Sequence, residues 1–321
     1  MKTTGLFPRA LCLCLALAAL ARPAVAAWPE RPVRIVLGLQ AGSTIDIVGR
    51  LLASHLQERF RQGVIVENRA GASGYGAARH VASSPPDGYT LMLGGSLAAF
   101  ETTLKEAAGI TDEFTYISQV RRSPSYFGVS TKRGFKSLRE LIDFGRANPG
   151  ALTYGSIARS LEFYAATFNR AAGIEAVHVP FRGSVDAVTA LAGGEFDYYF
   201  DSLAIFEPFV AQGKIRVLST TTQQRAPDRP EIPSLADAGV PDLNIWSSFG
   251  ILGPKGLPDE VVATINDAVR SFSALPDARE KLLALGLGAP VHSTPAEFRD
   301  NTLQELRVRR EAARFLGVAL Q

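Results

Sequence analysis

The chain has 321 residues, with 34 Lys and Arg against 31 Asp and Glu, and hydrophobic residues make up 46% of it. This composition is that of a globular protein and excludes a disordered or fibrous chain. A chain of this length buries roughly three quarters of its unfolded surface, so it needs neither a disulfide nor a metal to build a core.

The first residues are typical of a secretory signal peptide. Lys2 and Arg9 give a basic start, residues 11–21 form an apolar run, and residues 24–26 are a small-x-small cleavage pattern. The apolar run is shorter than the roughly 20 residues that a transmembrane helix needs. We therefore expect a signal peptide at residues 1–27 and an exported, periplasmic mature protein.

Cleavage changes the charge and removes both cysteines. The three basic residues Lys2, Arg9 and Arg22 leave with the signal peptide, which reduces the 34 basic residues to 31 and equals the 31 acidic ones. Because this balance has no basic excess, we expect no nucleic-acid partner. Without Cys12 and Cys14, disulfides, thiolate catalysis and zinc–thiolate sites are excluded, and no cluster has metal-ligand spacing. We expect no cofactor and no metal.

After residue 28, short β-branched runs alternate with longer helical patterns, which is typical of an α/β fold with mostly parallel strands. The first series predicts strands at 33–37, 64–66 and 89–93 and helices at 44–61 and 77–83. Gly63 is expected to end the first of these helices.

A second series begins near residue 126. Ser137 and Glu140 form a capping box for a helix ending at Asn148. Strands are expected at 152–154, 176–179, 196–200, 215–219 and 246–252. The tail is helical, with helix starts at Pro258, Pro276 and residues 294–297.

Two series joined by crossings near residues 121–129 and 246–252 predict two lobes, each with a mixed, mostly parallel sheet. We assign residues 28–125 and 248–321 to lobe 1 and residues 126–247 to lobe 2. Ligands of open α/β sheets bind beyond the carboxyl ends of strands. We therefore expect the site in the cleft where both lobes present their strand-to-helix loops.

The loop at residues 38–46 joins the first strand to the first helix. Its small residues allow backbone N–H groups to converge on an anion, and the helix dipole adds positive potential. In the alternative interpretation, Ser43 or Thr44 is only the N-cap and Asp46 a favourable first-turn carboxylate. Residues 71–76 contain a G-x-x-G-x-G pattern, but a tight turn into a helix explains it better than a dinucleotide site.

Ser96 follows a strand in a sequence one glycine short of a nucleophile elbow. A serine hydrolase also needs a positioned base, and none of the histidines outside the signal peptide lies in an obvious loop of lobe 1. Loop packing or hydroxyl donation to a ligand is therefore favoured over catalysis.

In the second lobe, Arg159 and Arg182 lie in loops that join a strand to a helix. They could clamp a carboxylate from opposite sides, or they are surface arginines that the helix dipole slightly disfavours. Asp201 follows a strand and is either a first-turn acid or a polar wall of the cleft.

Several segments also resemble one protein family. Residues 28–36 (WPERPVRIV) resemble its mature start, and residues 66–74 (VENRAGASG) resemble its "VENRPGAGG" segment. Residues 86–91 match "PDGYTL", and residues 177–183 (VHVPFRG) resemble "VHVPYKG". These motifs occur in the right order between residues 28 and 318, and the chain thereby resembles the solute-binding component of tripartite tricarboxylate transporters, the TctC or Bug family.

The resemblance implies a two-lobed periplasmic binding protein of type II that closes around a small carboxylated solute. It implies partners among membrane permease subunits or a sensor domain, and we expect a monomer. The first loop differs from the family's "PFPPGGSTD", and Glu162 stands where the family has a histidine. Carried onto this sequence, the ligand contacts are Leu39, Gln40, Ala41, Gly42, Ser43, Thr44, Asp46, Gly95, Ser96, Ser156, Ile157, Ala158, Arg159, Ser160, Arg182, Gly183 and Asp201.

The sequence is thus interpreted as a solute receptor and not as an enzyme. Two alternatives from other classes stay open. One is an exported serine hydrolase that uses Ser96. The other is a binding scaffold that has lost its solute and serves in signalling or as an interaction protein.

Overall fold

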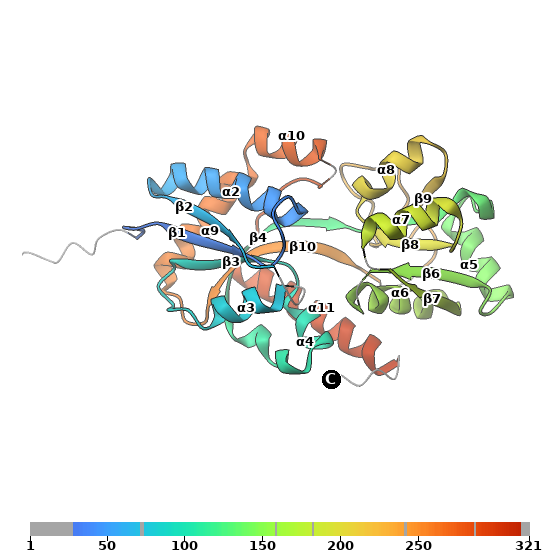
Figure 1. Cartoon of the computed structure of the whole chain (residues 1–321), viewed down its shortest axis with the longest axis horizontal. Coiled ribbons are helices and arrows are strands. Elements are labelled where there is room, and N and C mark those ends of the chain that lie inside the picture. Colours follow the sequence, from blue (N-terminus) through green and yellow to red (C-terminus); the bar gives the residue numbers. More distant parts are fainter. Residues whose placement is uncertain are drawn as a thin grey trace, which may run out of the picture.

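The computed structural model describes residues 28–70, 74–157, 159–181, 183–240, 243–285 and 287–315. The predicted signal peptide at residues 1–27 lies outside the described residues. Within the described ranges, no helix combines the length and apolar character that crossing a bilayer requires. The chain forms two lobes, each built on one five-stranded sheet (Figure 1).

The sheet of lobe 1 has the strand order β2-β1-β3-β10-β4. Strand β1 pairs in parallel with β2 and with the central strand β3, whereas β10 pairs antiparallel with both β3 and β4. The long strand β10, which comes from a distant part of the chain, therefore lies inside this sheet, between β3 and β4. The strands are β1 (Val33–Leu37), β2 (Val64–Asn68), β3 (Thr90–Gly94), β4 (Phe114–Pro124) and β10 (Trp246–Pro254).

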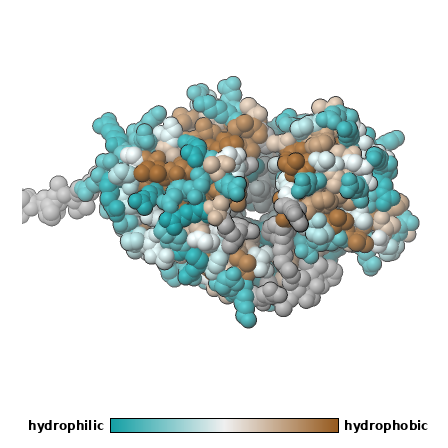
Figure 2. Space-filling model, in the orientation of Figure 1, coloured by the Kyte–Doolittle hydropathy of each residue, from teal (hydrophilic) through white to brown (hydrophobic). Residues whose placement is uncertain are grey.

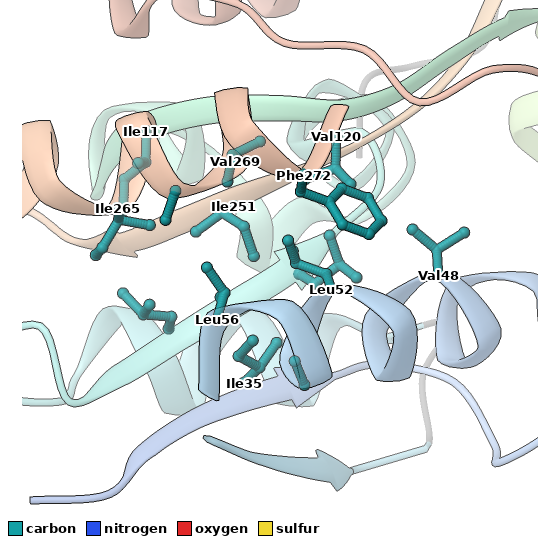
Figure 3. Packing of buried hydrophobic residues seen from close by; sticks show 14 of the residues in the cluster. Ile35, Val48, Leu52, Leu56, Ile117, Val120, Ile251, Ile265, Val269 and Phe272 are labelled. Atoms are coloured by element: carbon teal, nitrogen blue, oxygen red, sulfur yellow. The ribbon is translucent and has the colours of Figure 1, made fainter. Parts of the chain in front are cut away.

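Helices cover both faces of this sheet, as the alternation of buried side chains along β1 requires. Ile35 of β1 lies on the face of the sheet that α2 and α9 cover. It belongs to the same buried cluster as Leu52 of α2 and Phe272 of α9 (Figure 3). Val36 faces α3, α4 and the start of α11. Full burial of each such side chain contributes about 2 kcal/mol. The helices are α2 (Thr44–Phe60), α3 (Tyr75–Ala82), α4 (Leu97–Thr103), α9 (Asp259–Ser273), α10 (Pro276–Ala284) and α11 (Pro295–Phe315).

The sheet of lobe 2 has the order β7-β6-β8-β5-β9, and β5 is antiparallel to both of its neighbours. Phe127, Tyr198 and Phe200 pack with α5 and α6 on one face, while Tyr199 packs with α7 and with Phe206 of α8 on the other. The elements are β5 (Tyr126–Ser130), α5 (Leu138–Ala147), β6 (Leu152–Ser156), α6 (Arg159–Ala172), β7 (Ala176–Pro180), α7 (Ser184–Gly193), β8 (Tyr198–Asp201), α8 (Leu203–Ala211) and β9 (Ile215–Thr220).

Two crossings join the lobes at one end of the cleft. Ser125 separates β4 from β5, and Ile245 precedes β10. Thr221 connects the crossings, since its backbone N–H and its hydroxyl both donate to the Ser125 carbonyl, at 2.9 and 3.0 Å. The Ile245 N–H donates in turn to the Thr221 carbonyl at 2.8 Å. The two crossings are therefore bonded into one hinge.

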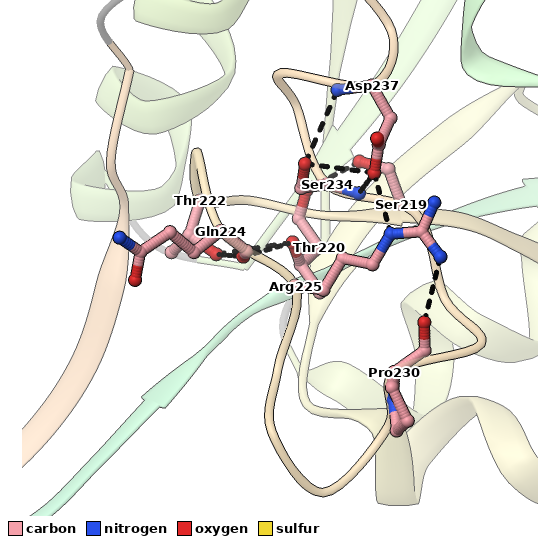
Figure 4. A network of polar contacts seen from close by, with 8 residues as sticks. All are labelled: Ser219, Thr220, Thr222, Gln224, Arg225, Pro230, Ser234 and Asp237. Atoms are coloured by element: carbon pink, nitrogen blue, oxygen red, sulfur yellow. Dashed lines mark hydrogen bonds and ion pairs between the residues drawn. The ribbon is translucent and has the colours of Figure 1, made fainter.

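The loop between β9 and β10 is held by a polar network rather than by secondary structure (Figure 4). The Asp237 carboxylate accepts hydrogen bonds from the Ser234 N–H at 2.8 Å and from Arg225 Nε at 2.9 Å. These bonds lower the pKa of Asp237 to about 2, the Ser234 N–H having the larger effect. Arg225 also donates to the Pro230 carbonyl, which fixes the proline-rich stretch.

Helix α11 belongs by its packing to both lobes. It contacts α4 and β4 of lobe 1 and reaches α6 of lobe 2, along the lower side of the molecule in Figure 1. Tyr164 of α6 donates from its hydroxyl to Glu305 of α11 at 2.8 Å. Arg309 of α11 pairs with Glu305 at 2.7 Å and also donates to the Tyr164 hydroxyl. This cluster is a direct polar contact between the lobes.

The predicted two-lobed α/β fold with a mixed sheet in each lobe is confirmed. In each sheet two pairings are parallel and two antiparallel, so parallel pairs are not the majority that the sequence analysis predicted. One expectation is wrong: Arg61, with φ 53°, and not Gly63, is the left-handed residue that ends α2. Helix α4 after Ser96 was not foreseen, since it has only seven residues and no strong capping box. The assignment of residues 28–125 and 248–321 to lobe 1 stays a proposal.

Candidate functional site

A cavity of about 300 Å³ lies between the lobes at the hinge. Figure 2 shows the molecule hollowed between the two lobes. Lobe 1 contributes the β3–α4 turn, lobe 2 contributes the end of β8, and the hinge strands β4 and β10 form the floor. The lining residues are Gly95, Ser96, Ala99, Arg121, Pro124, Ser125, Tyr164, Asp201, Ser202, Trp246, Ser247, Ser248, Phe249 and Arg309.

A second cavity of about 350 Å³ adjoins the first on the side of lobe 1. The two share Gly95, Ser96, Ala99 and Phe249. The walls of this second cavity are mostly apolar, with the side chains of Leu39, Ile45, Met92, Phe100 and Leu104. The pair of cavities thus offers a polar chamber with two arginines beside an apolar one, which suits a solute with a charged end and a hydrocarbon body.

Asp46 anchors the first loop of lobe 1. Its carboxylate accepts from the Gly42 N–H at 2.9 Å, from Arg50 Nε at 3.0 Å and from Asn68 Nδ2 at 3.0 Å. These bonds, led by the one from Arg50, lower the pKa of Asp46 to about 2. Gly42 adopts φ 81°, a left-handed conformation that favours glycine. Asp46 thereby shapes the loop, and its predicted contact with a ligand stays a prediction.

Two serines at helix starts behave differently. Ser96 is the N-cap of α4, and its hydroxyl accepts from the Ala99 N–H at 3.0 Å. Ser43 is the N-cap residue of α2, but its side chain makes no capping bond, and its buried hydroxyl has no hydrogen-bond partner among the described residues. Capping thus explains Ser96, whereas no described residue is a hydrogen-bond partner of the Ser43 hydroxyl.

The glycine-rich segment after β2 has a packing role where the structure describes it. Gly74 adopts φ 95° at the start of α3. A Cβ on Gly38 would come within 2.5 Å of the Gly74 Cα, so the loops after β1 and β2 touch through their backbones. This contact sets the position of the first loop beside the cavity. Residues 71–73 of the pattern lie outside the described residues.

The second-lobe candidates are only partly described. Ser156 ends β6 and bonds to His178, with 2.7 Å between Oγ and Nε2. Gly183 is the N-cap residue of α7. Asp201 accepts from the Tyr199 hydroxyl and from the Ser202 N–H, each at 2.7 Å. Ala158 and Arg182 lie outside the described residues, as do the side chains of Thr44, Arg159 and Ser160.

The structure brings only some of the predicted residues to the two cavities. Gly95 and Ser96 line both, Leu39 lines the apolar chamber, and Asp201 lines the polar one. Gln40, Ala41, Gly42 and Ser43 of the first loop, and Ser156, Ile157 and Gly183 of lobe 2, are not among the lining residues of either cavity. The described part of the site is therefore centred nearer to the hinge than the loops suggested.

Sequence reasoning missed Arg121 and Arg309, which both line the polar chamber and are each 3% exposed. Arg121 lies inside strand β4, and Arg309 lies in the arginine-rich helix α11. One signal for Arg121 was available in the sequence. A charged residue inside a predicted strand that crosses between the lobes is buried, and a buried charge needs a partner. For Arg309 no local signal distinguished it from the neighbouring arginines of α11.

No described histidine is placed to activate Ser96. His55 bonds to Ser271 at 2.7 Å, and His292 bonds to Asn266 at 2.9 Å. His178 does face a serine, Ser156, with Glu162 at 3.9 Å from its other ring nitrogen. That serine is 3% exposed and lines neither cavity, so this trio has no described space for a substrate.

The sequence matches the family described as "Tripartite tricarboxylate transporter family receptor" over residues 48–305. A protein of Cupriavidus necator, "UPF0065 protein in gbd 5'region", is 31% identical over 91% of this chain and 89% of its own length. Protein BugT of Bordetella pertussis is 27% identical over 91% of this chain and 92% of its own.

Two solved structures share the architecture. An R. palustris protein solved with adipate is 29% identical, with a TM-score of 0.75, over 90% of this chain and 98% of its own. MatC from Rhodopseudomonas palustris, with bound malate, is 26% identical, with a TM-score of 0.70, over 89% of this chain and 99% of its own. Sequence and fold are therefore similar along nearly the whole length of these proteins.

Proposed function

The chain belongs to the tripartite tricarboxylate transporter receptor family, and from that premise we propose that it captures a small carboxylate between its lobes. Receptors of this family are periplasmic, and the predicted signal peptide at residues 1–27 is our proposal for how this chain is exported. The loaded receptor delivers its solute to membrane permease subunits or, alternatively, to a sensor domain. We expect the receptor to act as a monomer.

One observation supports this function most directly: the cavity of about 300 Å³ is lined by residues of both lobes and of the hinge. A solute in that position touches two bodies at once and binds the closed arrangement better than the open one. Its differential affinity is what shifts the equilibrium toward closure. The bound adipate and malate of the two similar structures make small dicarboxylates the first solutes to try.

The lining of the cavity suggests which residues take part. Gly95 and Ser96 form the wall of lobe 1, and Asp201 forms the opposite wall. Arg159, the first residue of α6, and Arg182, which precedes α7 in the sequence, are proposed to approach the solute when the lobes close. Replacing Arg159 by alanine should weaken carboxylate binding about tenfold, since a charge-assisted hydrogen bond would be lost. An unchanged dissociation constant would remove Arg159 from the site.

The test is a thermal-shift screen of the purified protein with adipate, malate, citrate, amino acids and aromatic acids. A ligand at a hundred times its dissociation constant should stabilise the fold by roughly 2.7 kcal/mol, which is a shift of a few degrees. Small-angle scattering should then show a smaller radius of gyration with the ligand. A screen in which no carboxylate raises the melting temperature would contradict the proposal.

A matched pair of glycine variants tests whether the ligand binds in the cavity between the lobes. A Cβ on Gly95 would have its nearest neighbours at 3.8 and 4.0 Å, so a leucine there projects into the cavity without a backbone clash. Gly95→Leu should abolish binding of the screened ligand while the protein still folds. Gly76 of α3 is exposed, with no atom within 4 Å of its Cβ position, and Gly76→Leu should bind like the wild type.

We infer that the protein is a binding protein and not an enzyme. The Ser96 hydroxyl accepts from a backbone N–H, and the side chains of His55, His178 and His292 have other hydrogen-bond partners. A panel of ester substrates should therefore give no turnover above background with the purified protein. Turnover that Ser96→Ala removes would favour the hydrolase. A cleft whose geometry is the same with and without every ligand would favour the other alternative, a binding scaffold that has lost its solute.

A further inference from the structure

Arg121 is a buried cation on the floor of the cleft. Its side chain leaves β4 between the hinge strands and lies with its guanidinium carbon 5.3 Å from the centre of the Phe249 ring. Nε donates to the carbonyl of Leu287, and Nη1 donates to the Ser247 hydroxyl at 3.2 Å. Both acceptors are neutral. Arg121 is only 3% exposed and lines the polar chamber.

The positive charge of Arg121 has no nearby counter-ion in the described part of the chain. Its hydrogen bonds to described residues include no carboxylate, and the groups that favour its charge electrostatically are Tyr126 and Asp228, neither of them an ion-pair partner. Burial lowers the pKa of Arg121 to about 10, so it is still protonated at neutral pH. A buried charge without a partner is costly, and an anion in the chamber would remove that cost.

Arg309 lies at the same chamber and has a nitrogen to spare. Its Nε bonds to Glu305 at 2.7 Å, and Nη2 donates to the Tyr164 hydroxyl, above whose ring the guanidinium carbon lies at 4.4 Å. Its Nη1 is buried and has no hydrogen-bond partner among the described residues. Glu305 offsets the charge of Arg309 but does not bond to this nitrogen. The planar guanidinium presents such donors in a fixed direction.

We propose that Arg121 and Arg309 together form an anion subsite at the hinge end of the cleft, which receives a carboxylate of the solute. This inference rests on the proposed function and assigns it two specificity-determining residues. The apolar chamber beside it then holds the hydrocarbon part of the same solute. The subsite favours dicarboxylates over monocarboxylates, since a dicarboxylate can occupy it while its other carboxylate is held elsewhere, whereas a monocarboxylate fills only one of the two positions.

Asp201 is the acidic side chain of this chamber, and it restricts the choice of solute. Its carboxylate already accepts from Tyr199 and Ser202, and it lies on the lobe 2 side. Because Asp201 repels an anion close to it, the bound carboxylate has to lie toward the floor, where Ser247 and Arg121 are. Asp201 can also accept from a hydroxyl group of the solute.

The first experiment tests the subsite without any knowledge of the solute. The melting temperature of the purified protein is measured in acetate and in chloride at equal ionic strength. Acetate at ten times its dissociation constant should raise the melting temperature of the wild type by roughly 2 °C relative to chloride. Arg121→Met should lose this difference. Arg122→Met should keep it, because Arg122 is the next residue of β4 but stacks on Trp246 and does not line the chamber.

The second experiment measures selectivity by calorimetric titration with adipate and with hexanoate, which differ by one carboxylate. The wild type should prefer adipate by about tenfold, and Arg121→Met should reduce that preference to within twofold, while Arg122→Met keeps it. The ratio of the two affinities is the readout, because a merely structural defect would weaken both ligands alike. If Arg121→Met fails to fold, Arg309→Met is used, with the exposed Arg307→Met as its control.

The outcomes separate this inference from the proposed function. If carboxylates bind but the arginine variants keep the full acetate effect and the full preference for adipate, the subsite is overturned and the receptor function stands. If acetate stabilises the wild type in an Arg121-dependent way but no larger carboxylate binds, the subsite stands and the proposed solute class is wrong. An acetate effect equal in all variants, with no preference for adipate, overturns the subsite.

Discussion

Two buried charges in lobe 1 are accommodated in opposite ways. Asp46, at the start of α2, is 3% exposed and accepts hydrogen bonds from a backbone N–H, an arginine and an asparagine. Arg121, on the cleft floor, is equally buried and, among the described residues, donates only to a carbonyl and a hydroxyl. The first charge is fully compensated by the protein, and the second is not.

This difference separates scaffold from site. A compensated buried charge holds its surroundings in one geometry, and its pKa moves so as to favour the charged form, as that of Asp46 does. The pKa of Arg121 moves the other way, because burial disfavours its charge. Residues that the fold leaves uncompensated beside a cavity are therefore the stronger candidates for ligand contacts.

The largest effect is expected from Asp46→Ala. The substitution leaves the Gly42 N–H and Arg50 without their acceptor, and the free energy of unfolding should fall by about 3 kcal/mol. Urea unfolding measures it. As a control, Asp267→Ala removes only an exposed i,i+3 pair with Arg270 and should cost less than about 0.5 kcal/mol. Equal losses in the two variants would contradict the assignment of Asp46 to the scaffold.

The pH dependence of stability sharpens the same comparison. The folded pKa of Asp46 is about 2 and the ordinary value is 3.8, so its contribution of roughly 2 kcal/mol is complete above about pH 5. It is lost as the pH falls through the folded pKa, and about half remains at pH 3. The stability difference between wild type and Asp46→Ala should therefore narrow from pH 7 to pH 3. A difference that stays constant over this range would show that the ionised carboxylate is not what stabilises the loop.

A smaller effect is expected at the contact between the lobes. Tyr164→Phe removes the hydroxyl that joins Glu305 and Arg309, while these two still pair with each other. The unfolding free energy should fall by about 1 kcal/mol, and small-angle scattering without ligand should detect a more open average shape. Tyr89→Phe is the control, since the Tyr89 hydroxyl accepts only within lobe 1, from the Glu30 N–H. Unchanged scattering would show that this contact does not restrain the lobes.

The smallest effect is expected from Arg121→Met in the absence of ligand. Loss of the bonds to Leu287 and Ser247 is offset by relief of an uncompensated buried charge, so the unfolding free energy should change by less than about 1 kcal/mol. Urea unfolding of the unliganded protein provides the measurement. A loss as large as that of Asp46→Ala would mean that Arg121 is a scaffold residue after all.

The sequence predicted elements far better than it predicted the cavity. Short β-branched strands such as β1 and the capping box at Ser137 and Glu140 follow from local rules, and both are confirmed. The end of α2 was wrong because Arg61, which is exposed, adopts the left-handed conformation that local rules assign to glycine. Arg121 and Arg309 are 188 residues apart and meet only through the hinge and α11, which no local pattern encodes.

The insertion of β10 between β3 and β4 has a consequence for the order in which the polypeptide folds as it emerges. Lobe 2 is made from one continuous stretch, so its sheet can form as soon as Thr220 is available. In the finished sheet the neighbouring strand of β4 is β10, so β4 waits for residues 246–254, and α11 is added later still. Contacts between such distant segments form slowly. We therefore expect lobe 2 to fold first and the sheet of lobe 1 to stay incomplete until the chain is almost fully synthesised.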